Sequence, residues 1–185
     1  MLSDKRKTLI NLLKQVKNQK ILENLELIEI DNNDKELITK GIMFDNKHTC
    51  YHDYDKLEDM ITSLMVSCNN YGIYLYNEFI GIVSVFYQYY KDLTRLEISL
   101  SIKEEYRNNK IGTYCLNCII NNYFENTNIK SIHLSIREDN IKSRKMAENC
   151  GFKIYPGYKI DNYFTKEDGI KLKQVQYLLK RKDYY

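Results

Sequence analysis

A strand with alternating side chains leads directly into an amphipathic helix, and this pair constrains the fold more than any other feature of the chain. Between Leu93 and Ile102 apolar and polar residues alternate with a period of two, which predicts a half-buried strand. From about Asn109 to Phe124 apolar residues recur every three or four positions, which predicts a helix with one buried face. The fold must therefore combine a sheet with helices that pack on it.

The other segments complete one mixed sheet flanked by helices. Helical spacing is found at Ser3 to about Lys20, Asn33 to about Phe44, Asp53 to about Cys68, and Asn140 to Cys150, where Asn140 is the expected N-cap. Strand patterns are found at Leu25–Ile30, Ile73–Tyr76, Phe79–Tyr87, Lys130–Arg137, Phe152–Tyr158 and Lys173–Lys180, with a tight turn expected at Asn77-Glu78. We predict an α/β (α+β) fold and a single domain over residues 1–185, with residues 1–22 as an N-terminal helical extension.

The composition limits the classes of protein that remain. Hydrophobic residues make up 43% of the chain, which excludes compositional disorder. The net charge of +3 is spread along the chain rather than gathered in a basic stripe, so we expect no nucleic-acid partner. No apolar run approaches the roughly eighteen residues of a membrane span, so we expect no membrane partner.

Five cysteines at irregular spacing, without a secretion signal before them, predict free thiols and a cytoplasmic location. Cys115 and Cys118 have the spacing of a metal or redox pair. Both lie inside the predicted helix without a second cysteine pair, and Cys115 belongs to its apolar face. We therefore expect core packing there and no metal.

The connection from Tyr106 to Thr113 has the features of an anion site. The first turn of a helix exposes unpaired backbone N–H groups and the positive end of the helix dipole. Gly112 lets a ligand approach the backbone, while Arg107 and Lys110 add positive charge. The sequence lacks the Gly-Lys-Ser/Thr of a P-loop and the glycine pattern of a dinucleotide fingerprint, so neither of those phosphate sites is expected.

Two partial motifs, in order and on the expected elements, resemble the GNAT superfamily of acyl-CoA-dependent N-acetyltransferases. The family signature Arg/Gln-x-x-Gly-x-Gly/Ala corresponds to Arg107-x-x-Lys110-x-Gly112, where Lys110 replaces the first glycine. A second family pattern, Asn-x-x-Ala/Ser followed by Gly-Phe, corresponds to Asn140-x-x-Ser143 and Gly151-Phe152. The resemblance covers about residues 72–180, and it implies acetyl-CoA as co-substrate.

The resemblance also implies the architecture of the cofactor site. The family sheet is mostly antiparallel, has about six to seven strands, and splays between its fourth and fifth strands. Backbone N–H groups on the fourth strand hold the pantetheine arm and the thioester carbonyl, which here are those of Leu100, Ser101 and Ile102. The diphosphate contacts correspond to Arg107, Asn108, Lys110, Ile111, Gly112 and Thr113, with Asn140 and Ser143 beside the pantetheine and adenosine.

Acetyl transfer to an amine needs a base for the amine proton and a proton for the departing thiolate. Glu97, on the polar face of the fourth strand, is the first candidate for the base, and His133, on the facing strand, is the second. Many family members protonate the thiolate with a tyrosine at the position that Ala147 occupies here. Tyr158, Tyr163, Tyr87 or water would have to replace it.

The acceptor is expected to be a small-molecule amine or an amine of a peptide or protein. A homodimer is possible, since dimers are frequent in the family. The replaced glycine and the missing tyrosine leave open a different class of function, a non-catalytic module that binds acyl-CoA and senses or regulates.

Overall fold

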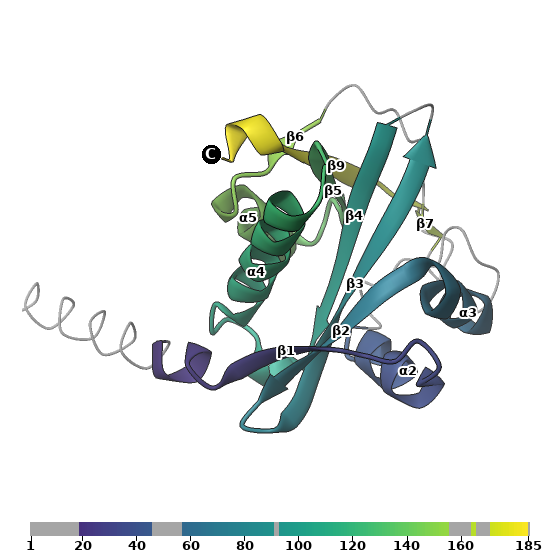
Figure 1. Cartoon of the computed structure of the whole chain (residues 1–185), viewed down its shortest axis with the longest axis vertical. Coiled ribbons are helices and arrows are strands. Elements are labelled where there is room, and N and C mark those ends of the chain that lie inside the picture. Colours follow the sequence, from purple (N-terminus) through teal and green to yellow (C-terminus); the bar gives the residue numbers. More distant parts are fainter. Residues whose placement is uncertain (1–18, 46–56, 91–92, 156–163, 166–170, 185) are drawn as a thin grey trace, which may run out of the picture.

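One mixed sheet forms the centre of the protein (Figure 1). The computed structural model describes residues 19–45, 57–90, 93–155, 164–165 and 171–184. In the described residues the sheet has seven strands in the order β1-β2-β3-β4-β5-β9-β6. These strands are β1 (Leu25–Glu29), β2 (Cys68–Leu75), β3 (Glu78–Tyr90), β4 (Leu93–Ile102), β5 (Ser131–Arg137), β6 (Lys153–Ile154) and β9 (Gln174–Lys180).

All neighbouring strands of this sheet are antiparallel except β4 and β5, which are parallel. The short strands β7 (Phe164–Thr165) and β8 (Lys171–Leu172) pair with each other in a separate ladder. The predicted mixed, mostly antiparallel sheet is thus confirmed.

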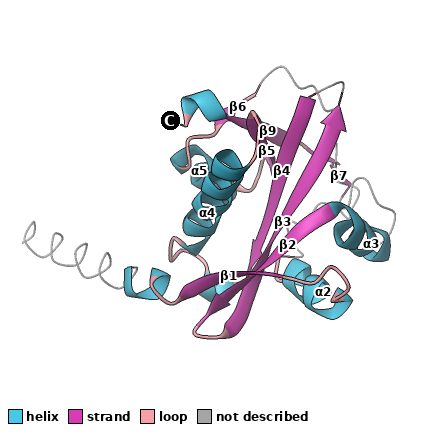
Figure 2. Cartoon of the chain, in the orientation of Figure 1, coloured by secondary structure: helices cyan, strands magenta, loops and turns pink. Residues whose placement is uncertain are grey.

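Helices cover both faces of the sheet, as Figure 2 shows. The helices are α2 (Lys35–Met43), α3 (Leu57–Ser67), α4 (Ile111–Asn126) and α5 (Ile141–Asn149), with short 3-10 turns at Glu104–Tyr106 and Arg181–Asp183. One core cluster joins α4 and α5 to the apolar face of β4 and β5. A second cluster joins α2 and α3 to the opposite face, mainly through Phe79 and Ile82 of β3. The sheet therefore separates an α4–α5 side from an α2–α3 side.

Features that depend on a few consecutive residues agree closely with the predictions from the sequence. β4 has the predicted bounds, and α4 begins two residues later than predicted, at Ile111. The side chain of Asn140 accepts a hydrogen bond from the Ser143 amide and caps α5. Gly151, just past the end of α5, has a φ of 86°, which favours glycine.

Two local predictions were wrong. The turn between β2 and β3 is centred on Tyr76 and Asn77, which both have positive φ, and not on Asn77-Glu78. Positive φ at both central residues gives the twist that a two-residue hairpin needs. β2 also begins five residues earlier than predicted, at Cys68, because buried hydrogen bonds from Asn70 to Leu64 O and from Ser84 to Asn70 stabilise asparagine in the strand.

Of the predicted N-terminal helix, residues 19–22 are helical, and residues 1–18 lie outside the described residues. No described helix is both long and apolar enough to cross a membrane.

Candidate active site

The two parallel strands at the centre of the sheet part soon after they meet. Their ladder contains two pairs, Leu96 with Ile132 and Glu97 with His133. β4 continues to Ile102 and is paired there only with β3, while β5 continues to Arg137 and is paired there only with β9. A gap in the ladder therefore opens beyond Glu97 and His133, as the family resemblance implies.

The hydrogen-bond pattern of β4 shows which of its backbone groups point toward this gap. The Lys103 amide donates to Ile80 O at 2.9 Å, and facing residues of an antiparallel pair alternate between bonded and non-bonded. Ser101 and Ser99 therefore direct their amides toward β3, whereas Leu100 and Ile102 direct theirs toward β5. Of the three residues expected to hold pantetheine through the backbone, Ser101 does not have the required amide direction.

Ser101 differs from the expectation in its side chain as well. Its hydroxyl is buried on the α2–α3 side and has no hydrogen-bond partner among the described residues. A buried hydroxyl without a partner is unfavourable, so this position is suited to a polar ligand group or a water molecule.

Glu97 and His133 are brought together by the last pair of the parallel ladder. Facing residues of neighbouring strands carry their side chains on the same face, which here is the α2–α3 side. Glu97 is half-buried and His133 is 7% exposed. The Nε2 atom of His133 lies 3.1 Å from Ser131 Oγ, and its ring meets the Tyr155 ring edge-on. The two base candidates thus lie next to each other at the apex of the gap.

The loop before α4 contains two residues in the left-handed conformation. We call this loop, residues 108–110, the cradle. Asn108 and Lys110 have φ values of 64° and 63°. Lys110 is the N-cap of α4 and gives no side-chain hydrogen bond to the first turn, so the amides of Ile111, Gly112 and Thr113 are not capped by it. Lys110 therefore has a left-handed conformation, which glycine adopts more easily than a residue with a Cβ.

Gly112 favours close packing as well as ligand approach. A Cβ at this position would lie 2.7 Å from Met146 Sδ and 3.2 Å from Leu100 Cδ2. The missing side chain lets the first turn of α4 pack closely on α5 and β4. It thereby places the uncapped amides beside the open end of the gap.

The side chain of Arg107 is engaged with the ends of β4 and α2. Its guanidinium donates to Ile102 O at 2.7 Å through Nε and to Phe44 O at 2.6 Å through Nη2. Nη2 also lies 3.5 Å from the Asp45 carboxylate. The charge expected at the diphosphate is thus engaged with the end of α2. The contact with Phe44 spans 63 residues, so no local signal in the sequence could have revealed it.

Asn140 and Ser143 meet each other through the cap of α5, at 3.2 Å between Ser143 N and Asn140 Oδ1. Because α5 packs against the start of α4 through Met146, both residues lie near the cradle. The Asn140 oxygen accepts one hydrogen bond in the cap, so its second lone pair, its NH2 group and the Ser143 hydroxyl remain for a ligand.

Neither Ala147 nor Tyr87 can act as the acid that many family members carry on α5. Ala147 is fully buried in the core. Tyr87 contacts the Tyr123 ring on the α4 side and is paired with Leu96, at the closed end of the gap. Tyr158 and Tyr163 lie outside the described residues.

The cysteines of the described region are free thiols. Burial raises the pKa of Cys115 to about 12 and that of Cys150 to about 11, which keeps both protonated and unreactive near neutral pH. In the part of the chain that the structure describes, no group of three His, Cys, Asp or Glu side chains could hold a metal ion.

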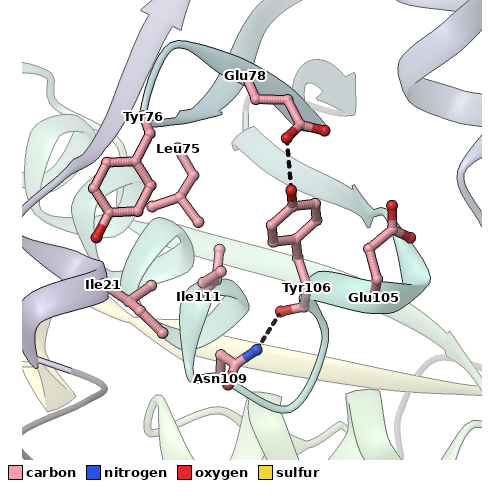
Figure 3. A pocket seen from close by; sticks show the side chains of 8 residues that line it. All are labelled: Ile21, Leu75, Tyr76, Glu78, Glu105, Tyr106, Asn109 and Ile111. Carbon is pink, nitrogen blue, oxygen red and sulfur yellow. Dashed lines mark hydrogen bonds between the residues drawn. The ribbon is translucent and has the colours of Figure 1, made fainter.

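A surface pocket of about 350 Å³ lies between the turn that joins β2 to β3 and the connection that leads into α4 (Figure 3). Its apolar wall includes Ile111. The Tyr106 hydroxyl donates to Glu78 at 2.6 Å, and Asn109 Nδ2 donates to Tyr106 O at 3.3 Å. These bonds hold the cradle against the turn between β2 and β3.

A sheet that parts between parallel strands, with free amides along one edge and a helix start beside them, defines the class of acyl-CoA-dependent acetyltransferases. The chain matches the family described as "Acetyltransferase (GNAT) domain" over residues 24–153, well over half of its length. The protein therefore belongs to the GNAT acetyltransferase family, whose members transfer acetyl groups from acetyl-CoA to amines.

Solved structures agree in fold. Spermidine N-acetyltransferase from Vibrio cholerae, in complex with CoA and spermine, is similar with a TM-score of 0.63 and 16% identity, over 88% of this chain and 98% of that one. RimL, a ribosomal L7/L12 alpha-N-protein acetyltransferase in complex with coenzyme A, is similar with a TM-score of 0.65 and 15% identity, over 85% of this chain and 94% of that one. At this identity the likeness concerns the fold alone. No protein with a curated description matches the sequence.

Proposed function

We propose that residues 1–185 form one acetyltransferase domain that transfers an acetyl group from acetyl-CoA to a primary amine of a small molecule, peptide or protein. The observation that carries the proposal is the geometry of β4. Its amides at Leu100 and Ile102 face an unpaired edge, and this edge leads to the uncapped start of α4. Such a row of donors fits an extended amide-containing arm that ends in a diphosphate.

The residues present fit acetyl-CoA at this edge. The pantetheine arm would be held by the amides of Leu100 and Ile102. The diphosphate would be held by the backbone of the cradle and the first turn of α4, with the Lys110 ammonium and the Thr113 hydroxyl nearby, and this set comprises Asn108, Lys110, Ile111, Gly112 and Thr113. The remaining amide group of Asn140 and the hydroxyl of Ser143 are suited to the pantetheine and adenosine end.

Glu97 is the proposed base. When bound, the co-substrate supplies an activated thioester carbonyl, which the nitrogen of the amine attacks. As the C–N bond forms and the C–S bond breaks, the ammonium proton passes to Glu97, directly or through water, and the thiolate takes up a proton. A gap-facing amide of β4 is placed to donate to the carbonyl oxygen as negative charge develops.

His133 remains the alternative base because it is paired with Glu97 at the apex. Its contact with Ser131 fixes the position of the ring. Tyr158, Tyr163 and water remain the candidates for protonating the thiolate.

The amine would enter from the α2–α3 side, where Glu97 and His133 lie. The acceptor of this chain is open among polyamines, aminoglycosides, amino acids and protein N-termini. Two of these classes are represented among the similar structures, by a spermidine N-acetyltransferase and by a ribosomal protein acetyltransferase.

We also propose a cytoplasmic location and a homodimer. Free cysteines fit a reducing compartment. The Vibrio cholerae spermidine N-acetyltransferase is itself an oligomer, a dodecamer.

The second candidate function is a non-catalytic sensor of acyl-CoA. One observation favours it, namely that the buried Ala147 takes the position of the family's acid. Under this alternative the cradle and the β4 edge bind the thioester, but no amine reacts.

Thiol release from acetyl-CoA with a panel of amines tests the proposal. The panel contains spermidine, an N-terminal peptide, an amino acid and an aminoglycoside. An enzyme releases CoA with at least one of them, and a sensor with none while still binding CoA.

Glu97→Gln then separates the two bases. We expect a loss of at least about 100-fold in kcat with CoA affinity within about threefold of wild type, as is typical for loss of a general base. His133→Gln is the matched variant at the paired position. If Glu97→Gln retains full turnover and His133→Gln loses it, His133 is the base.

A further inference from the structure

Two cations on the connection between β4 and α4 hold the last turn of α2. Arg107 Nη2 donates to Phe44 O at 2.6 Å, and Lys103 Nζ lies 5.4 Å from the centre of the Phe44 ring. Asp45 completes the set as the anionic partner of Arg107 at 3.5 Å. We call these four residues, Phe44, Asp45, Lys103 and Arg107, the α2 clasp.

The clasp connects the two sides of the sheet. α2 packs on the α2–α3 side, over Ile82 of β3. Arg107 is the residue before the left-handed cradle, and its Nε holds Ile102 O at the end of β4. One guanidinium therefore joins the last turn of α2 to the end of β4, and its own backbone leads directly into the cradle.

The hydrogen bonds of the α2 clasp are strong and have a fixed geometry, so they link the positions of the segments that they join. Hydrogen bonds from a charged guanidinium to carbonyl oxygens are stronger than neutral ones, and Arg holds two acceptors in a fixed geometry. The last carbonyls of a helix have no partner within the helix, so Phe44 O depends on Arg107. The Arg107 side chain is only 30% exposed, which limits screening by solvent.

We propose that Arg107 is a positioning residue that couples occupation of the cofactor cradle to the order of α2 on the acceptor side. This proposal rests on the proposed function, since it requires a coenzyme A diphosphate at residues 108–113. Ordering of the cradle fixes Arg107, and Arg107 then fixes the last turn of α2 before an amine enters. Because such coupling is reciprocal, a well-ordered α2 also raises the affinity for CoA.

Hydrogen exchange of the amides of residues 41–45, with and without CoA, tests the coupling on the full chain. In the wild type we expect CoA to slow exchange there by about tenfold or more, although α2 lies across the sheet. In Arg107→Met, exchange without CoA should be faster by about tenfold, and CoA should no longer slow it. CoA affinity, measured by calorimetry, should fall by less than about tenfold, a loss below that of a direct charged ligand.

Three further variants test whether the effect on hydrogen exchange is specific to the Arg107 guanidinium. Arg144→Met removes another arginine that bonds a carbonyl, Glu138 O, and should leave exchange at residues 41–45 unchanged. Asp45→Asn keeps both carbonyl bonds of Arg107, so CoA should still slow exchange there. Arg107→Lys keeps the charge but loses the two-acceptor geometry, so it should behave like Arg107→Met at α2.

The possible results distinguish failure of the coupling from failure of the proposed function. If CoA binds the wild type without slowing exchange at residues 41–45, the coupling is overturned and the cofactor site stands. The coupling is also overturned if Arg107→Lys restores full wild-type behaviour or if Arg107→Met abolishes CoA binding, because Arg107 then acts by its charge on the diphosphate. Absence of CoA binding to the wild type overturns the proposed function itself.

Discussion

Lys110 stands where the family motif has a glycine, and its backbone is in the conformation that favours glycine. A left-handed φ is strained for a residue with a Cβ, whereas glycine adopts it freely. Lys110 has this conformation, with a φ of 63°, and adds an ammonium group beside the cradle. The sequence alone revealed the substitution, but it could not reveal the left-handed conformation of the lysine.

Replacing Lys110 with glycine should therefore leave the folded protein at least as stable. We expect Lys110→Gly to keep or raise Tm, because relief of left-handed strain offsets the flexibility of glycine. Lys110→Val should lower the free energy of unfolding by about 1–2 kcal/mol, since a β-branched residue tolerates this φ least. Thermal unfolding of both variants is the measurement, with Asn109→Gly as the control at a neighbour that has no positive φ. A lower Tm for Lys110→Gly than for Lys110→Val would contradict this account.

At Ala147 we expect the opposite, because introducing the family's tyrosine there should destabilise the folded protein. Its side chain is fully buried, so a tyrosine there overpacks the core and should lower the free energy of unfolding by about 1–3 kcal/mol or more. Lys145→Tyr, at an exposed position of the same helix, should change it little. Denaturant unfolding and thiol release measure both effects. Faster thiol release by a stable Ala147→Tyr would show that the position reaches the thiolate after all.

At the scale of elements, the features that depend on neighbouring residues were predictable. The alternation of β4, the apolar face of α4 and the glycine after α5 each depend on a few consecutive side chains. The early start of β2 could not be predicted because it depends on contacts of Asn70 with α3 and β3. The amide direction of Ser101 was missed for a similar reason, since it depends on the register with β3.

The cap of α5 is a local element that can be tested directly. Asn140 Oδ1 satisfies the Ser143 amide in the first turn. Asn140→Ala should lower the free energy of unfolding by about 1 kcal/mol, which corresponds to about 2–4 °C in Tm for a chain of this size. Asn140→Asp keeps the acceptor and should stay close to the wild type. Equal Tm values for Asn140→Ala and the wild type would mean that the cap contributes no stability.

At the scale of the whole molecule, the site arises because strand pairing fails at one place. β4 and β5 meet at two pairs and then follow different partners, so one edge of β4 is left open inside the sheet. An unpaired edge is normally a liability that proteins cover. Here α4 starts near the end of that edge (Figure 1), and its uncapped amides add donors to those of the edge. The sequence indicated each strand and helix, but the gap followed only from the resemblance, because the ladder between β4 and β5 depends on residues 36 positions apart.

If the β4 edge and the start of α4 bind CoA as proposed, the diphosphate should stabilise the folded protein more than the pantetheine arm does. A ligand that binds only the folded state adds about 2.7 kcal/mol at 100 times its Kd. For a chain of this size, that corresponds to a rise in Tm of roughly 5–10 °C. We expect this rise with CoA and a rise below about 1 °C with pantetheine at the same concentration, because pantetheine lacks the diphosphate that the start of α4 attracts. Gly112→Val, whose side chain would push α4 away from Met146 and Leu100, should lose most of the rise with CoA. Equal shifts with CoA and pantetheine would place the affinity in the β4 edge alone, and the cradle would then have no role in binding.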